Sequence, residues 1–296
     1  MALDVGKVLK PMRKIRKLLN EASDPPTANQ VHDLRTASRK LEASVQAMSL
    51  DSRHNEKRVL KYVGRLRKRA GRVRDMDVLI DYTCNVPAKK DDGCRLQLLA
   101  HLGAKRDKSA NKLHAIMRQY APCLRPRLKR SAARVEKVLD GKSKTPAAKP
   151  APTEVAASVF QLSSDLASPK RLGRTTLHPY RLKVKELRNL LQMADNPTEP
   201  ALVDLLGEVK DAIGEWHDWE ELIAIATDVL DHKPACPLMS QLKRISNAKF
   251  EHALTLTETL KKEILGKAKS KRKHGLSARA NGAADPILAA ARELAA

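Results

Sequence analysis

The chain has 296 residues, of which 57 are Lys or Arg and 34 are Asp or Glu, so its formal charge at pH 7 is +23. An excess of this size repels itself unless anions are nearby, which favours a strongly negative partner. The composition excludes three classes of protein. A hydrophobic content of 42% argues against disorder of the whole chain. The four cysteines form no Cys-x-x-Cys pair, and no run of residues is apolar enough for a signal peptide or a membrane span. We therefore expect a soluble protein of the reducing cytoplasm.

Apolar residues recur at intervals of three and four over most of the chain, and strand signals are scarce, which predicts an all-α fold. In the first half this spacing predicts helices over residues 3–21, 28–49, 53–83 and 93–139. In the second half it predicts helices over 154–167, 176–194, 200–231 and 237–265.

These helices fall into two groups of four. The sequence predicts a first bundle over residues 1–140, a Pro- and Ala-rich extended connector over 141–154, and a second bundle over 155–265. The remaining segment, 266–296, is basic and poor in apolar residues, and we expect it to be a mobile tail.

One motif occurs twice: VHDLRTASRKL begins at Val31 and LHPYRLKVKEL begins at Leu177. In both copies the apolar residues fall on one helical seam, and the histidine and several cations follow a seam position by one residue, a rotation of roughly 100°. Cations beside a buried seam must reach water, pair with acids or line a cavity that holds an anion. The repetition favours the last of these.

Each histidine of the motif lies near the predicted start of its helix. Thr27 and Gln30 predict a capping box, and Thr175 or Thr176 is placed to cap the second motif helix. Since a helix start offers free N–H groups and the positive end of the dipole, His32 and His178 are candidate phosphate contacts.

A second segment is also repeated, because GRLRKRAGRVRDMDVL from Gly64 matches GEVKDAIGEWHDWEEL from Gly207. The match aligns Gly71 with Gly214 and Asp75 with Asp218. Glycine costs up to about 1 kcal/mol in a helix interior, so these glycines indicate a close approach of another chain segment. We expect Asp75, Asp77 and Asp218 to orient neighbouring arginines, and Trp216 and Trp219 to belong to the core.

Residues 53–74 contain ten Lys or Arg and one acid, Glu56. Four of these cations form a stripe beside the apolar seam: Arg58, Arg65, Arg69 and Arg72. Cations this dense on one helix repel one another unless an anion neutralises them. Weaker signals come from cations among apolar residues further along the chain, at Arg106, Lys112 and Arg244.

These motifs together resemble the CHAD domain, the conserved histidine α-helical domain, over about residues 3–265. The resemblance implies two four-helix bundles related by a pseudo-twofold axis, with a basic central groove or pore that binds inorganic polyphosphate. By motif position it assigns phosphate contacts to His32, Arg35, Arg39, Lys40, His178, Arg181, Lys183, Lys185 and Arg188. Glu42 and Glu186 depart from it, because they stand where the family has cations. Members of the family also occur with triphosphate tunnel enzymes or on polyphosphate granules.

The sequence therefore predicts non-catalytic binding of polyphosphate between two helical bundles, with no catalytic residue, cofactor, metal ion or membrane partner. The predicted site comprises His32, Arg35, Arg39, Lys40, Arg58, Arg65, Arg69, Arg72, Arg106, Lys112, His178, Arg181, Lys183, Lys185, Arg188 and Arg244. Two alternatives remain. The first is a nucleic-acid-binding protein, because basic helices also suit the phosphate backbone of DNA or RNA. The order of His178, His217-Asp218 and Asp231 is that of metal-dependent phosphohydrolases, although surrounding cations would oppose a metal ion.

Overall fold

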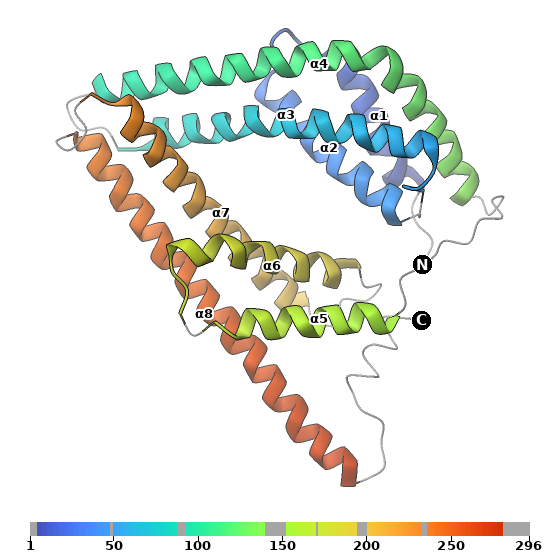
Figure 1. The fold of residues 1–296 in the computed structure, drawn as a ribbon, viewed down its shortest axis with the longest axis vertical. Helices are drawn as coiled ribbons and strands as arrows, with labels where there is room; N and C mark the ends of the chain where they lie inside the picture. Colours follow the sequence, from blue (N-terminus) through green and yellow to red (C-terminus); the bar gives the residue numbers. More distant parts are fainter. Residues whose placement is uncertain are drawn as a thin grey trace. The chain divides into compact units, whose positions relative to one another are not determined.

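The computed structural model describes residues 5–47, 50–87, 93–139, 152–169, 171–193, 200–231 and 236–280. Over these ranges the regular structure is helical throughout, which confirms the all-α prediction (Figure 1). The helices are α1 (Val5–Glu21), α2 (Ala28–Ala47), α3 (His54–Asn85), α4 (Gly93–Leu139), α5 (Pro152–Ala167), α6 (Arg174–Met193), α7 (Pro200–Val229) and α8 (Pro237–Ala280).

The apolar periodicity located these helices well, and the largest difference concerns α8. This helix continues to Ala280, beyond the end predicted at residue 265. The added stretch is rich in Lys, Arg and Ala, which have high helix propensity, so it forms helix without an apolar face. The predicted connector falls almost wholly on residues 140–151, outside the described part of the chain, as does the segment 281–296.

The helices divide between two compact units. In the first unit, α1 and α3 each pack against both α2 and α4, so the four helices enclose one core. Every helix contributes fully buried side chains to that core. Among them are Leu9 and Ile15 of α1, Leu34 and Leu41 of α2, Leu66 and Val73 of α3, and Leu113 and Leu124 of α4.

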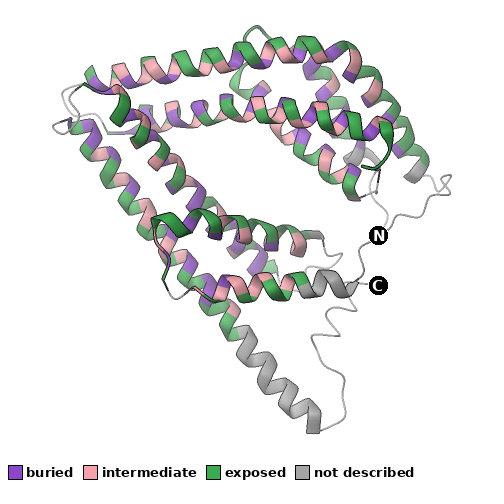
Figure 2. Cartoon of the chain, in the orientation of Figure 1, coloured by how far each residue is buried: buried purple, intermediate pink, exposed green. Residues whose placement is uncertain are grey.

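The second unit contains α5, α6, α8 and nearly all of α7. Its core receives Leu166 from α5, Leu187 from α6, Trp216 from α7 and Leu260 from α8. The ring centroids of Trp216 and Phe250 are 5.4 Å apart, and Trp219 is buried as well. Both tryptophans are therefore core residues, as predicted. Buried positions recur at intervals along the described parts of the helices, as the purple segments of Figure 2 show.

The start of α2 has the predicted cap, whereas α6 begins at Arg174, two residues before Thr176. Thr27 N donates to Gln30 Oε1 at 3.0 Å and Gln30 N donates to Thr27 Oγ1 at 3.3 Å, which confirms the capping box before α2. Before α6, Gly173 N donates to Thr176 Oγ1 at 2.8 Å. His32 and His178 consequently occupy the same place, the fifth residue of α2 and of α6.

The one acid among the cations of residues 53–74 is a structural residue. Glu56 is 1% exposed, and it accepts hydrogen bonds from Ser131 Oγ at 3.0 Å and from Arg134 Nη1 at 2.9 Å. Asn55 Nδ2 also donates to Ser131 Oγ. This network joins the first turn of α3 to the last turns of α4, because a buried carboxylate is stable only when its oxygens are bonded.

Candidate anion-binding site

In the second unit, two arginines of α6 cross over two glycines of α7. Arg181 Nε donates to the carbonyl oxygen of Lys210 at 3.0 Å, and Arg188 Nε donates to that of Val203 at 3.3 Å. A Cβ atom on Gly214 would lie 2.8 Å from Arg181 Nη2, and one on Gly207 would lie 3.2 Å from Arg188 Nε. The close approach that the glycines predicted is therefore made by arginine side chains.

These contacts fix the guanidinium groups without neutralising them. Each arginine has five N–H donors, and the bond at Nε sets the plane of the group while leaving the Nη donors for another ligand. Neither Arg181 nor Arg188 forms an ion pair with a described carboxylate. Two positive groups are thus held in place at the surface between α6 and α7, and both are partly exposed.

The corresponding arginine of the first unit has a different partner. Arg35 of α2 lies near Gly71 of α3, whose added Cβ would be 3.9 Å from Arg35 Nη1. The same Nη1 lies 3.3 Å from Asp75 Oδ1 and makes a long hydrogen bond of 3.5 Å to the Gly71 carbonyl oxygen. Asp75 orients an arginine, as predicted, and it also neutralises much of that charge.

The outer end of the motif differs between the copies too. Where α6 has Arg188, α2 has Glu42, and Glu42 Oε2 pairs with Arg67 Nη1 of α3 at 2.8 Å. This departure from the family pattern therefore replaces an unneutralised arginine by an ion pair between helices.

The two motif histidines also differ in their surroundings. His32 is exposed, and its Nε2 lies 3.5 Å from Thr36 Oγ1 one turn later. The ring of His178 faces that of His217 on α7, with centroids 5.0 Å apart and planes tilted by 39°.

Lys183 lies on another side of α6, toward α5. Its Nζ is 2.7 Å from Asp165 Oδ2, and this hydrogen bond holds the pKa of the Asp165 carboxyl below its ordinary value. Three other motif cations, Arg39, Lys40 and Lys185, are exposed to solvent. Lys183 is thus separated from the arginines that face α7, although its motif position is the one the family resemblance assigned.

The basic stripe of α3 is mostly open to solvent. Arg58, Arg65 and Arg72 are exposed and Arg69 is partly exposed, while Arg65 Nη1 bonds to Tyr120 Oη of α4 at 3.2 Å. Lys112 of α4 and Arg244 of α8 are exposed as well.

Arg106 has a structural contact. Its Nε donates to Asp77 Oδ1 at 2.8 Å and its Nη2 donates to the carbonyl oxygen of Pro26 at 3.3 Å. The side chains of Arg106 and Asp77 are only 18% and 8% exposed. Asp77 therefore orients a neighbouring arginine, as predicted, and Arg106 links three segments of the first unit.

Sequence reasoning overlooked a cationic face on α1. Lys10, Arg13, Lys14 and Lys17 line a shallow hollow on this helix. Lys14 pairs with Asp33 of α2 at 2.7 Å and Lys17 with Glu21 at 3.6 Å, whereas Lys10 and Arg13 are exposed and lack a described carboxylate partner. The spacing of three and four residues was visible in the sequence, but no histidine motif marked it.

Positive charge is concentrated in the first half of the chain. Residues 1–149 contain 36 Lys and Arg against 15 Asp and Glu, a net charge of +21, whereas residues 150–296 contain 21 against 19, a net of +2. Helix α7 alone carries eight acids and a single lysine. The two halves share a motif but differ strongly in electrostatic character.

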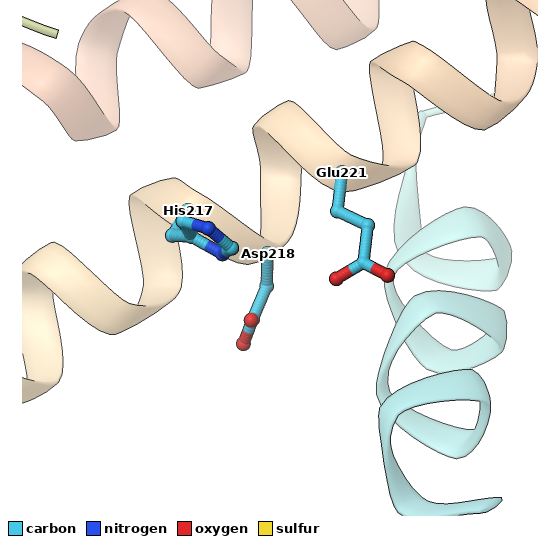
Figure 3. A group of neighbouring side chains, drawn as sticks. All are labelled: His217, Asp218 and Glu221. Carbon is cyan, nitrogen blue, oxygen red and sulfur yellow. The ribbon is translucent and has the colours of Figure 1, made fainter. Parts of the chain in front are cut away.

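One acidic group on α7 includes a histidine. His217, Asp218 and Glu221 each offer a ligand atom, and these atoms lie within 4.8 Å of one another (Figure 3). All three residues come from consecutive turns of one helix.

The structure thus defines an all-helical, basic protein in which each of two units packs a motif helix, carrying a histidine and arginines, against a glycine-containing helix. The family model for the CHAD domain matches residues 12–226, which is most of the chain, so the protein belongs to the CHAD family. The match ends before α8, and it is shorter than the resemblance suggested. No curated protein and no solved structure matched the chain. Within the described residues, none of the helices is long and apolar enough to cross a membrane.

Proposed function

We propose that this protein binds inorganic polyphosphate and does not transform it chemically. The observation that carries the proposal is the pair Arg181 and Arg188, each fixed by a backbone carbonyl and neither neutralised by a described carboxylate. A guanidinium held in this way can donate two parallel bonds to phosphate oxygens. Such charge-assisted bonds contribute about 1.5–3 kcal/mol each.

The first half of the chain contributes positive charge of its own. Residues 1–149 have a net charge of +21, which attracts a polyanion from a distance, and the exposed arginines of α3 offer contacts along more than one helical turn. Polyphosphate suits this arrangement because it presents a negative charge at every repeat and no base that must be recognised. Membership of the CHAD family supports the same ligand.

The proposal includes the setting of the protein. Binding to a polymer that is stored in granules would place the protein in the cytoplasm at the granule surface, where a triphosphate tunnel enzyme is a suitable partner. No membrane contact is part of this proposal.

The direct test is polyphosphate affinity, measured by calorimetry at physiological salt, for the double variant Arg181→Ala with Arg188→Ala. We expect affinity to fall by more than tenfold, because about 1.4 kcal/mol corresponds to one decade and two charge-assisted contacts are lost. Circular dichroism should show unchanged helicity.

A matched control removes the same charge elsewhere. Lys10→Ala with Arg13→Ala also subtracts two positive charges, from exposed side chains of α1 without described carboxylate partners. This control should lower affinity by less than about threefold. Equal losses in the two double variants would mean that binding depends on net charge alone, and the assigned site would be wrong.

Nucleic acid is the second candidate, favoured by the cationic surface of α3. Recognition of single strands uses exposed aromatic rings for stacking, but Trp216 and Trp219 are buried, and Phe160 is the large aromatic side chain that the described residues leave most exposed. We therefore expect long-chain polyphosphate to displace labelled duplex DNA or RNA at equal phosphate concentration. Displacement in the opposite direction would reverse the preference.

A further inference from the structure

We propose that the first unit has a binding site for a nucleoside triphosphate, formed where α3 and α4 pack along one another (Figure 1). The site centres on Tyr62 of α3 and Tyr120 of α4, whose ring centroids lie 4.8 Å apart with planes tilted by 57°. Arginines of both helices flank this pair. The whole is named the tyrosine–arginine surface and comprises Arg58, Tyr62, Arg65, Arg69, Tyr120 and Arg127.

The two tyrosines supply a place for a base. Both are partly exposed, although they border the core of the first unit. An aromatic ring at the surface offers a face on which any base can stack. Residues 1–149 contain one further Phe, Tyr or Trp, which is Tyr82, so two of their three aromatic rings meet at this surface.

The arginines of α3 lie on the same side of the helix as Tyr62. Arg58 precedes it by four residues, and Arg65 and Arg69 follow it by three and seven. The four side chains therefore fall within an arc of about 60° and extend over about 16 Å of the helix axis. Arg65 Nη1 donates to Tyr120 Oη at 3.2 Å, which places one guanidinium beside the ring pair. A base on the rings would have its phosphates within reach of this arginine.

Helix α4 adds positive charge from its own side. Arg127 follows Tyr120 by seven residues, which is about two turns. The carbonyl oxygen of Arg127 accepts a hydrogen bond from Asn55 Nδ2 at 3.2 Å, so this part of α4 lies against the start of α3. Residues 108–135 contain eight Lys or Arg and no acid.

The arginines of the surface are largely unneutralised. Arg58, Arg69 and Arg127 form no ion pair with a described carboxylate. Glu56, at the start of α3, is buried, and its oxygens already accept bonds from α4. The surface therefore favours a chain of phosphates.

The combination of groups selects the class of ligand. Inorganic polyphosphate would use the arginines and leave the rings unused, whereas a nucleic-acid strand needs a series of rings for its successive bases. A nucleoside triphosphate uses both parts, because it brings one base and a short phosphate chain. The α3 arginines are shared with the proposed polyphosphate contacts, and in this respect the inference rests on the proposed function.

The test compares ATP with inorganic tripolyphosphate by calorimetry on the full chain without metal ions. Tripolyphosphate carries at least as much negative charge as ATP, so charge alone cannot make ATP bind more tightly. We expect ATP to bind at least about fivefold more tightly, the low end of what one stacked base contributes. Equal or weaker binding of ATP would overturn the inference, and this comparison needs no variant.

Aromatic substitutions locate the base. Tyr62→Leu with Tyr120→Leu keeps apolar side chains against the core but removes both rings, so the preference for ATP should fall below about twofold. Tyr62→Phe with Tyr120→Phe keeps the rings and should retain the preference. Phe160→Leu is the control, because it removes a ring that is 66% exposed on α5, and it should retain the preference as well. Loss in Phe160→Leu, or survival in the leucine double variant, would contradict the assignment.

Arginine substitutions test the same site without touching the core. Arg58→Ala with Arg69→Ala removes side chains that reach solvent, and it should weaken ATP binding by at least about tenfold. Lys10→Ala with Arg13→Ala removes the same charge from α1 and should weaken it by less than about threefold. Equal losses in the two double variants would mean that ATP responds only to net charge, and the site would be wrong.

Polyphosphate binding separates the two proposals. If polyphosphate binds through Arg181 and Arg188 but ATP is not preferred over tripolyphosphate, the nucleotide site alone is wrong. If ATP is preferred and polyphosphate does not bind, the proposed function fails and the nucleotide site remains. Oligoadenylate RNA that bound more than about tenfold more tightly than ATP at equal phosphate concentration would assign the surface to nucleic acid and overturn the inference.

Discussion

The carboxylate of Asp75 distinguishes two arginines that share a position in the motif. Arg181 and Arg35 occupy the same motif position, but Arg181 bonds to the Lys210 carbonyl oxygen whereas Arg35 also faces Asp75 at 3.3 Å. The sequence predicted that both would lie beside the apolar seam, because that depends only on helical periodicity. It also predicted that Asp75 would orient an arginine, but it could not predict that Arg181 would bond to a carbonyl oxygen instead, since that depends on how closely the side chain approaches the neighbouring helix.

At the same scale, the pair formed by Lys183 and Asp165 supplies a prediction for Asp165→Asn. The substitution frees Lys183 and raises the net charge by one, so polyphosphate affinity at low salt should rise by about two- to threefold. Asp211→Asn is the control, because it changes the charge equally and frees Lys210 of α7. Equal gains in both variants, or a loss in Asp165→Asn, would show that Lys183 does not contact the ligand.

The same carboxylate gives a dependence on pH. Its pKa is lowered from the ordinary 3.8, chiefly by the hydrogen bond from Lys183, so the pair stabilises the fold above pH 3.8 and this contribution is lost as pH falls through the lowered pKa. The stability difference between wild type and Asp165→Asn, measured by urea unfolding, should therefore be present at pH 7 and shrink below pH 3.8. A difference that stayed constant down to pH 2 would contradict this assignment.

At the scale of helices, the glycines of α3 and α7 offer a matched comparison. Gly71→Ala adds a methyl group at an ordinary 3.9 Å from Arg35, whereas Gly214→Ala places it 2.8 Å from Arg181 and must displace that side chain. Both variants gain helix propensity, worth up to about 1 kcal/mol. We expect Gly71→Ala to raise the unfolding temperature with unchanged polyphosphate affinity. Gly214→Ala should weaken binding by about two- to tenfold, the worth of one oriented hydrogen bond. Similar affinities in the two variants would mean that Arg181 needs no glycine opposite it.

The buried network at the start of α3 is a second feature of this scale. Glu56→Ala leaves Ser131 Oγ and Arg134 without their carboxylate acceptor and opens a space between α3 and α4. We expect the free energy of unfolding to fall by about 1–3 kcal/mol in a denaturant titration. Glu136→Ala removes an exposed acid of the same helix region and should change it by less than about 0.5 kcal/mol. Comparable stability of the two variants would show that the network does not join these helices.

Helix positions were the part of the fold that the sequence predicted best. A period of 3.6 residues marks the seams of α2, α3, α6 and α7 directly, and the capping pair Thr27 and Gln30 gave the start of α2. The end of α8 was missed because helix propensity, not an apolar seam, continues it to Ala280. The pseudo-twofold relation of the two units stays a prediction.

At the scale of the whole molecule, the two halves share a motif and differ in charge. The repeated histidines suggested two equal contributions to one site, but the net charges of +21 and +2 assign most of the attraction for a polyanion to residues 1–149. The sequence contained this imbalance. The motif comparison did not reveal it, because it aligned only the residues that the halves have in common.

This excess charge predicts a strong effect of salt. By analogy with single-stranded nucleic acid, the logarithm of affinity should fall with the logarithm of salt concentration at a slope of about −0.7 for each phosphate contacted, so ten contacts give a slope near −7. A calorimetric series from low to physiological salt measures the slope. A nearly constant affinity would contradict binding by charge.

The concentration of +21 on one half also limits how much polymer one copy can neutralise. With one charge on each repeat, a stretch of about 23 phosphates matches the net charge of +23 of a single copy, and a polymer several times longer keeps enough free charge to recruit further copies. Long polyphosphate would then act as a multivalent scaffold and drive coacervation. Turbidity should be greatest near charge equivalence, and it should fall again when polymer is in excess because the droplets dissolve. Short oligophosphates would leave the solution clear.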